Sequence, residues 1–167
     1  MRILGVDPGL QCTGYGLIEA LGGTLRLIEG GVIRTDPHAP LALRLRTLYE
    51  GLGGILREYE PGCVVVEELY TKYAHPRTAI LMGHARGMAL LAAGEHGVTV
   101  VGYPASLIKR ALTGNGRATK AQVGRMVCQV LGLEQAPSPD DVTDALALAL
   151  CHASPTRSRL TDRGGRR

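Results

Sequence analysis

The sequence contains no phenylalanine and no tryptophan, and six tyrosines are its only aromatic residues. Its hydrophobic core must therefore be built from leucine, valine, isoleucine and alanine, and any tyrosine on the surface becomes a candidate for a specific role. Hydrophobic residues still make up 45% of the 167 residues. This content and length are sufficient for one compact domain with a buried core.

Cysteine is also scarce. Cys12, Cys63, Cys128 and Cys151 are far apart in the chain, and no two of them form a C-x-x-C pair. The spacing therefore favours neither a zinc site nor a disulfide framework. We interpret the four thiols as small core or surface residues.

Long apolar segments are missing as well. The best candidate, residues 79–93, is interrupted by His84 and Arg86 and is shorter than the roughly 18 residues that a membrane helix needs. Residues 1–7 predict a strand at the start of the sequence, and they lack the apolar core and cleavage site of a secretory signal. The simplest interpretation is a cytoplasmic protein with no membrane segment.

Charged residues are unevenly distributed along the chain, which has a formal net charge of +4. Basic residues predominate in 69–133 and 154–167, whereas acidic residues predominate in 1–68 and 134–153. A nuclease needs both kinds of region, because Lys and Arg bind phosphates while carboxylates bind a metal ion. The alternative is a chance segregation of charges on solvated faces.

The first half of the sequence predicts three strands, a helix and a fourth strand. Short apolar or alternating segments separated by glycine-rich turns predict consecutive antiparallel strands at 2–6, 14–20 and 25–33. Leucines 41, 45, 48, 52 and 56 have helical spacing and predict a helix over 41–59. Residues 63–66 form a continuous apolar run, which is typical of a strand covered on both faces.

The second half is predicted to be mainly helical. The expected elements are a helix at 77–94, a strand at 98–102, a helix at 104–112, a helix that begins with a Thr119/Gln122 capping box and ends at Gly132, and a last helix with Ser138 as N-cap and Pro139 at its first position. Residues 1–153 should therefore form an α/β domain with a part antiparallel, part parallel sheet. Residues 154–167 are expected to be a basic, disordered tail.

Four carboxylates stand at informative places in this arrangement. Asp7 ends the first strand and Glu67 ends the fourth, so both emerge at one edge if the strands are neighbours. Asp141 and Asp144 are three residues apart, which places their Cβ atoms roughly 5 to 6 Å apart on one helix face. Clustered carboxylates repel one another unless a cation neutralises them, and oxygen ligands favour Mg²⁺ or Mn²⁺. Two such ions could drive in-line hydrolysis of a phosphodiester without a side-chain nucleophile.

Each acid also has a simpler explanation. Asp7 could initiate an Asp-Pro-Gly turn, and Asp141 lies near the third position of a helix, where the helix dipole favours an acid. Asp140 is interpreted as solvated surface with no role. The set of four, on the predicted elements, is a stronger indication than any single member.

Several motifs in order resemble one known family, the RuvC Holliday junction resolvases of the ribonuclease H-like superfamily. The motifs are Gly5-Val6-Asp7-Pro8-Gly9, Thr13-Gly14-Tyr15-Gly16, Val66-Glu67-Glu68, Ala85-Arg86-Gly87 and Asp141 to Ala147, within a similarity that covers residues 2–152. The resemblance implies a ribonuclease H-like fold with a five-stranded mixed sheet. It also implies symmetric nicking of four-way DNA junctions, with 5′-phosphate and 3′-hydroxyl ends, and it assigns metal binding to the same four acids.

The resemblance places two DNA-contacting lysines of the family at Lys109 and Lys120, and an aromatic that engages bases at Tyr70. The full predicted DNA-binding set is Tyr70, Lys72, Arg77, Lys109, Arg117 and Lys120. The glycine-rich loop at 114–116 and the helix start after it could admit a phosphate. The alternatives are a surface aromatic that covers a strand end and a solvated basic loop.

A two-fold symmetric junction suggests a homodimer with two active sites. The small residues of helix 77–94 permit close helix approach, as in the family interface, although a core helix would explain them nearly as well. The resemblance also suggests the branch-migration proteins RuvA and RuvB as partners. Two other functions compete: an ATP-dependent kinase or chaperone-type fold, which would need a second domain, and a non-catalytic junction-binding scaffold, which would be expected to lose one of the acids.

Overall fold

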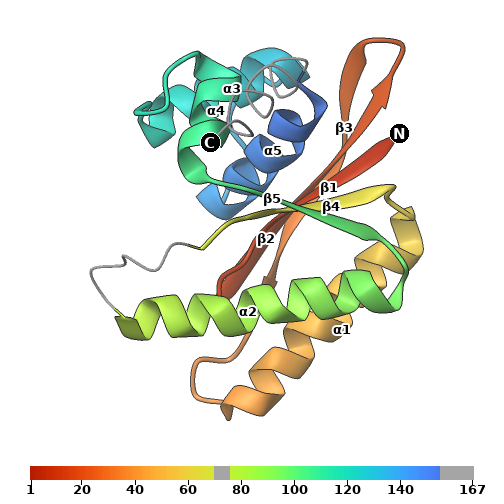
Figure 1. Cartoon of the computed structure of the whole chain (residues 1–167), viewed down its shortest axis with the longest axis vertical. Coiled ribbons are helices and arrows are strands. Elements are labelled where there is room, and N and C mark those ends of the chain that lie inside the picture. Colours follow the sequence, from red (N-terminus) through yellow and green to blue (C-terminus); the bar gives the residue numbers. More distant parts are fainter. Residues whose placement is uncertain (70–75, 155–167) are drawn as a thin grey trace, which may run out of the picture.

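A computed structural model describes residues 1–69 and 76–154 of the chain. Its centre is one five-stranded sheet in the order β3-β2-β1-β4-β5 (Figure 1). The strands are β1 (Arg2–Asp7), β2 (Cys12–Leu21), β3 (Thr24–Arg34), β4 (Cys63–Glu67) and β5 (Thr99–Tyr103). The helices are α1 (Leu41–Tyr59), α2 (Pro76–Glu95), α3 (Ala105–Thr113), α4 (Lys120–Leu131) and α5 (Asp140–Ala153).

The sheet has the predicted mixture of strand directions. β1 pairs with β2 in antiparallel and with β4 in parallel orientation, and β5 adds to β4 in parallel. The predicted α/β class, with three antiparallel strands followed by two parallel ones, is confirmed. β1 and β4 are interior strands, so each of them is hydrogen-bonded on both sides.

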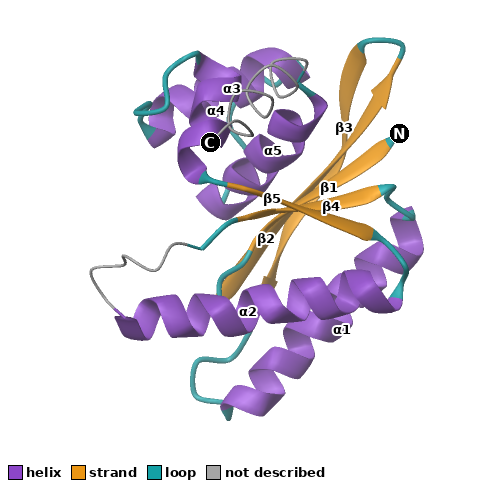
Figure 2. Ribbon diagram, in the orientation of Figure 1, coloured by secondary structure: helices purple, strands orange, loops and turns teal. Residues whose placement is uncertain are grey.

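Helices cover both faces of the sheet (Figure 2). α1 and α2 lie against one face, and α3, α4 and α5 lie against the other. Along β1, Ile3 packs into the cluster that contains α5 residues, while Leu4 packs into the cluster that contains α1 and α2 residues. This explains the continuous apolar runs of β1 and β4, and it leaves only the strand ends for polar groups.

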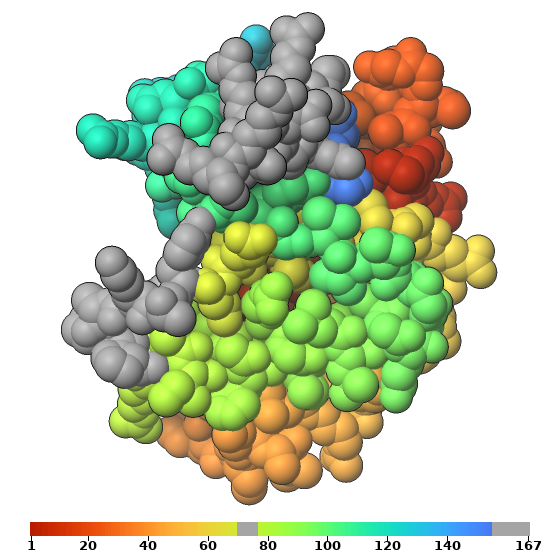
Figure 3. Space-filling model, in the orientation of Figure 1, coloured from red at the N-terminus to blue at the C-terminus, as the bar shows by residue number. Residues whose placement is uncertain are grey.

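Side chains fill the space between these layers. On the face that Figure 3 shows, a narrow hollow opens between the residues of α2 and those around β5. The polar chemistry of the described residues should therefore be sought where strands end and helices begin.

The start of α5 differs from the prediction. The helix begins at Asp140, its N-cap is Pro139, and no side chain caps its first turn. Ser138 is therefore not the N-cap, because the extended backbone continues through Pro139 before the helix begins. Asp141 occupies the second helical position rather than the third.

The remaining helix signals agree with the structure. Thr119 and Gln122 form a reciprocal capping box at the start of α4, and Gly132 ends that helix in the left-handed conformation. Within the described part of the chain, no helix has the length and apolar character needed to cross a membrane. Of the predicted tail at 154–167, residues 155–167 lie outside the described residues, so the structure does not test this prediction.

Candidate active site

Asp7 and Glu67 lie at the ends of two neighbouring strands. β1 and β4 run parallel with Val6 paired to Val66, so the next residue of each strand emerges at the same edge of the sheet. Those next residues are Asp7 and Glu67. The sequence pattern required β1 and β4 to be neighbours for the two acids to meet, and the sheet order fulfils this condition.

Three glycines bring the acids of α5 to this edge, because they let the helix lie directly on β1 and β2. A Cβ atom at Gly5 would lie 1.9 Å from the carbonyl oxygen of Ala145, and one at Gly14 would lie 2.1 Å from that of Asp141. At Gly16, a Cβ atom would meet the side chain of Leu146 at 2.6 Å. A larger residue at any of these positions would displace α5.

The sequence-based interpretation used these glycines as motif positions and missed their packing role. Gly14 and Gly16 are two residues apart on one strand, so both face the same side of the sheet. Glycine within a strand indicates a close backbone approach, and this was the signal that could have revealed the helix contact.

Three of the predicted acids line one pocket at this edge, with a volume of about 360 Å³. The lining residues are Asp7, Glu67, Met82, Ala105, Ile108, Lys109, Lys120, Val123, Asp144, Ala147 and Leu148. Asp141 is not among them; it lies beside Cys12, whose thiol has its pKa raised by burial and then by the charge of Asp141. The structure thus brings Asp7, Glu67 and Asp144 together in the pocket and places Asp141 one helical turn from Asp144.

The acids are close enough to perturb one another. Burial, followed by repulsion from Asp144, Glu67 and Asp141, raises the pKa of Asp7 from 3.8 to about 7. Burial also raises the pKa of Glu67, and the charge of Asp144 adds to the effect. All four carboxylates therefore contribute to one region of negative potential, in which the proton affinity of Asp7 is much higher than usual.

Lys120 partly neutralises this region. It is the first residue of α4, and its Nζ donates a hydrogen bond to Asp144 Oδ2 at 2.6 Å. This bond is the main cause that raises the pKa of Lys120. The lysine side chain is 72% exposed, so it can exchange Asp144 for another anion without leaving a buried environment.

The donor set of the pocket suits a hard divalent cation. Its ionisable lining groups are carboxylates and ammonium groups, with no imidazole or thiol. Across residues 1–69 and 76–154, no three acidic, histidine or cysteine side chains already surround one point closely enough to hold an ion. Because the Lys120 ammonium occupies the place of a cation beside Asp144, the residues fit a divalent ion once this ammonium has moved.

The predicted DNA-binding residues are divided between the pocket and its surroundings. Lys109, on α3, and Lys120 line the pocket. Arg77, at the start of α2, and Arg117, in the α3–α4 loop, are exposed and do not line it. Tyr70 and Lys72 lie outside the described residues.

Arg86 is a further residue near the site whose contact the sequence-based interpretation missed. It lies on α2 and donates a hydrogen bond from Nε to the main-chain oxygen of Glu67 at 3.1 Å. The Ala85-Arg86-Gly87 motif marked the position, but nothing in the sequence indicated a partner 19 residues away.

Comparison with known proteins gives consistent matches. The family model described as "Crossover junction endodeoxyribonuclease RuvC" matches residues 3–152. RuvC of Desulforamulus reducens is 48% identical over 153 residues, which cover 92% of this chain and 93% of that protein. RuvC of Moorella thermoacetica is 45% identical over 168 residues, covering 99% and 100%. The Thermus thermophilus RuvC structure with a Holliday junction substrate has a TM-score of 0.88 and 38% identity, covering 95% of this chain and 96% of that one.

Proposed function

The chain belongs to the RuvC family of crossover junction endodeoxyribonucleases, and we propose that it resolves Holliday junctions by hydrolysis at the pocket of Asp7, Glu67 and Asp144, with Asp141 beside it. The observation that carries this proposal is the meeting of acids from three separate elements, β1, β4 and α5, with two lysines at one sheet edge. Carboxylates and ammonium groups in one pocket suit a metal ion and a phosphate together.

Mg²⁺ or Mn²⁺ is the proposed cofactor, with two ions per site held by Asp7, Glu67, Asp141 and Asp144. The cations would activate the attacking water and stabilise the leaving oxygen. The burial and mutual repulsion that raise the pKa of Asp7 support this assignment, since a cation is what would relieve both. No residue of the pocket needs to form a covalent intermediate.

The lysines are proposed to bind the phosphate that is cut. Lys109 and Lys120 line the pocket on the α3 and α4 side, opposite the ends of β1 and β4. An approaching phosphate would compete with Asp144 for the Lys120 ammonium, and its capture would free the Asp144 carboxylate. Water then adds to phosphorus and the 3′ oxygen leaves with a proton, so the ends are a 5′-phosphate and a 3′-hydroxyl.

Residues outside the pocket are proposed to hold the arms of the junction. Arg77, at the start of α2, and Arg117, in the α3–α4 loop, are exposed basic residues. Tyr70 and Lys72 are assigned a DNA-binding role by resemblance alone. Contacts of this kind set register on the DNA, while the pocket performs the chemistry.

A homodimer is proposed because a two-fold junction needs two equivalent cuts. α2 exposes three large apolar side chains, those of Ile80, Leu90 and Leu91, at 61%, 37% and 48% exposure. A second copy of the chain would bury them. RuvA and RuvB are proposed as partners on family resemblance, and the cytoplasm as the place of action.

The test is cleavage of a labelled mobile four-way junction by wild type and by Asp7→Asn, with Mg²⁺ and Mn²⁺ in turn. Wild type should cut two opposite strands symmetrically, whereas Asp7→Asn should bind the junction but not cut it. Cleavage by Asp7→Asn at the wild-type rate would refute the assigned site. Binding without cleavage by wild type under every metal condition would favour a junction-binding scaffold instead.

A further inference from the structure

The main-chain oxygen of Glu67 faces a gap in the β-sheet hydrogen bonding. The N–H of Glu68 donates to the carbonyl oxygen of Tyr103 on β5 at 2.9 Å. Successive residues of a strand direct their main-chain groups to opposite neighbours, so the Glu67 carbonyl faces β1 instead. The register pairs Val6 with Val66, so the residue that would donate to this carbonyl is residue 8, directly after the end of β1.

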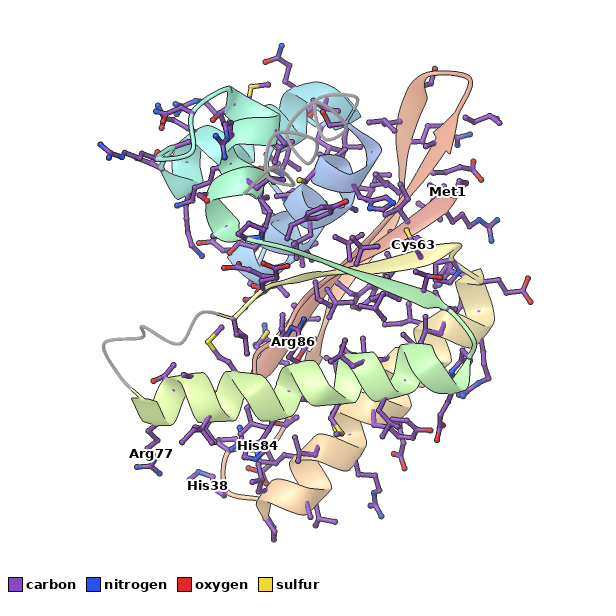
Figure 4. All side chains as sticks on the ribbon, in the orientation of Figure 1. Met1, His38, Cys63, Arg77, His84 and Arg86 are labelled. Atoms are coloured by element: carbon purple, nitrogen blue, oxygen red, sulfur yellow. The ribbon has the colours of Figure 1, made fainter. Side chains whose placement is uncertain are left out.

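Residue 8 is Pro8, which has no N–H to donate. The ladder between β1 and β4 accordingly ends at Val6 and Val66, one position before the two acids. Arg86 supplies the missing donor from a different element, because its Nε–H donates to the Glu67 oxygen at 3.1 Å. Figure 4 shows the Arg86 side chain between α2 and the sheet, whereas Arg77 and His84 lie away from the strands.

The helix around Arg86 is well fixed. Ala85 and Ala89, on either side of it in α2, are 1% and 3% exposed, and Ala89 belongs to the core cluster that contains Val64 and Val66 of β4. The guanidinium is therefore held by a packed helix, and its bond restrains the peptide that follows Glu67. Rotation of this peptide would redirect the Glu67 side chain.

We propose that Arg86 is a positioning residue for Glu67: it replaces the N–H that Pro8 lacks and thereby keeps the Glu67 carboxylate aimed into the pocket. This inference rests on the proposed function, because the role of Glu67 is assigned there. Arg86 itself need not touch DNA or metal. Outer partners of this kind typically change metal affinity or activity by about 10- to 100-fold when they are removed.

The test uses the gap at Pro8. Arg86→Met removes the donor, Pro8→Ala introduces a main-chain N–H directly after β1, and the double variant combines the two. Arg86→Met should lower Mn²⁺ affinity of the DNA-free protein, measured by calorimetry, by about tenfold or more. The single-turnover cleavage rate at saturating junction should fall at least as far, while junction affinity should stay within about twofold of wild type.

Pro8→Ala in the Arg86→Met background should restore most of the lost Mn²⁺ affinity and cleavage rate. Arg86→Lys should have values between those of wild type and Arg86→Met. Non-additivity of this kind is the signature of two groups that serve one atom. Arg57→Met is the charge-matched control, since Arg57 is an exposed arginine of α1, and it should change neither metal affinity nor rate. If Arg86→Met does not fold, a folded double variant with near wild-type Mn²⁺ affinity supports the proposal, and one that also fails to fold or to bind Mn²⁺ overturns it.

Two further results would overturn the proposal. Weaker junction binding by Arg86→Met with an unchanged rate at saturation would make Arg86 a phosphate contact. Failure of Pro8→Ala to restore Mn²⁺ affinity would show that the carbonyl bond is not the reason for the loss. If wild type cut no junction, the proposed function would fail, whereas the Mn²⁺ measurements would still decide the role of Arg86.

Discussion

Asp7→Asn should stabilise the metal-free protein while it abolishes cleavage. The Asp7 carboxyl has its pKa raised from 3.8 to about 7, first by burial and then by the neighbouring acids. The folded state therefore binds a proton at Asp7 more tightly than the unfolded chain does. The stability that this provides is fully present below about pH 4 and is lost as the pH rises through about 7.

The size of the effect follows from the same shift. A change in the Asp7 pKa from 3.8 to about 7 corresponds to at most about 4 kcal/mol in the free energy of unfolding. Relaxation of the protein around the charged carboxylate makes about 2 kcal/mol a realistic value. Asparagine keeps the shape of the side chain and carries no charge at any pH. At pH 8 in a chelator, Asp7→Asn should therefore unfold about 4 to 8 °C above wild type. The difference should disappear near pH 4.

The assay is thermal and urea unfolding of both proteins between pH 4 and pH 9, with and without Mn²⁺. Mn²⁺ should raise the melting temperature of wild type much more than that of Asp7→Asn, because ligand binding stabilises only a state that can bind. Asp140→Asn is the matched control, since Asp140 is an exposed acid in the first turn of α5 that does not line the pocket. Equal or lower stability of Asp7→Asn at pH 8, or a parallel pH dependence of the two proteins, would refute the reasoning.

Three other predictions concern the same site. Gly14→Ala should lower the free energy of unfolding by about 1 to 3 kcal/mol and cut the cleavage rate severely, since its Cβ would lie 2.1 Å from the Asp141 carbonyl oxygen. The control Gly54→Ala, at an open position in α1, should instead raise the free energy of unfolding by up to about 1 kcal/mol. Equal urea unfolding midpoints for the two variants would contradict this. Lys120→Met should raise the Mn²⁺ affinity of the DNA-free protein about tenfold while weakening junction binding, because it removes the ammonium paired with Asp144; an unchanged calorimetric affinity would mean that the ion pair does not compete with the metal. Mn²⁺ affinity of wild type should fall as the pH is lowered through about 7, since Asp7 becomes protonated there, and a flat profile from pH 8 to pH 6 would argue against Asp7 as a ligand.

Most of the fold could be predicted because its signals are local. The apolar runs of β1 and β4, the helical spacing in α1 and the capping box at Thr119 depend on neighbouring residues, and each produced the expected element. The start of α5 could not be predicted to the residue. Ser138 and Pro139 are both acceptable at a helix start, and the choice depends on how the preceding loop enters the helix rather than on propensity.

The meeting of three acids in one pocket could be predicted from the sequence, but Asp141 does not line that pocket, and the contacts that support the acids could not be predicted. Asp7 and Glu67 could be paired in advance because both end apolar strands. The sequence also marks Gly14 and Arg86, yet their functions depend on contacts with residues far away along the chain, Asp141 and Glu67. Such contacts exist only after strand order and register have been chosen.

Packing of the sheet explains how Asp7, Glu67 and Asp144 are held close together despite their repulsion. The repulsion among Asp7, Glu67 and Asp144 is opposed by burial of β1 and β4 in two hydrophobic clusters, one on each face of the sheet. Because these clusters fix the strand ends, the carboxylates cannot relax by moving apart, and protonation of Asp7 and the ion pair of Lys120 are the responses that remain. Weakening the core under β1, for example by Val6→Ala, should therefore lower the pKa of Asp7 as well as the stability, which titration of the Asp7 carboxyl by NMR would detect.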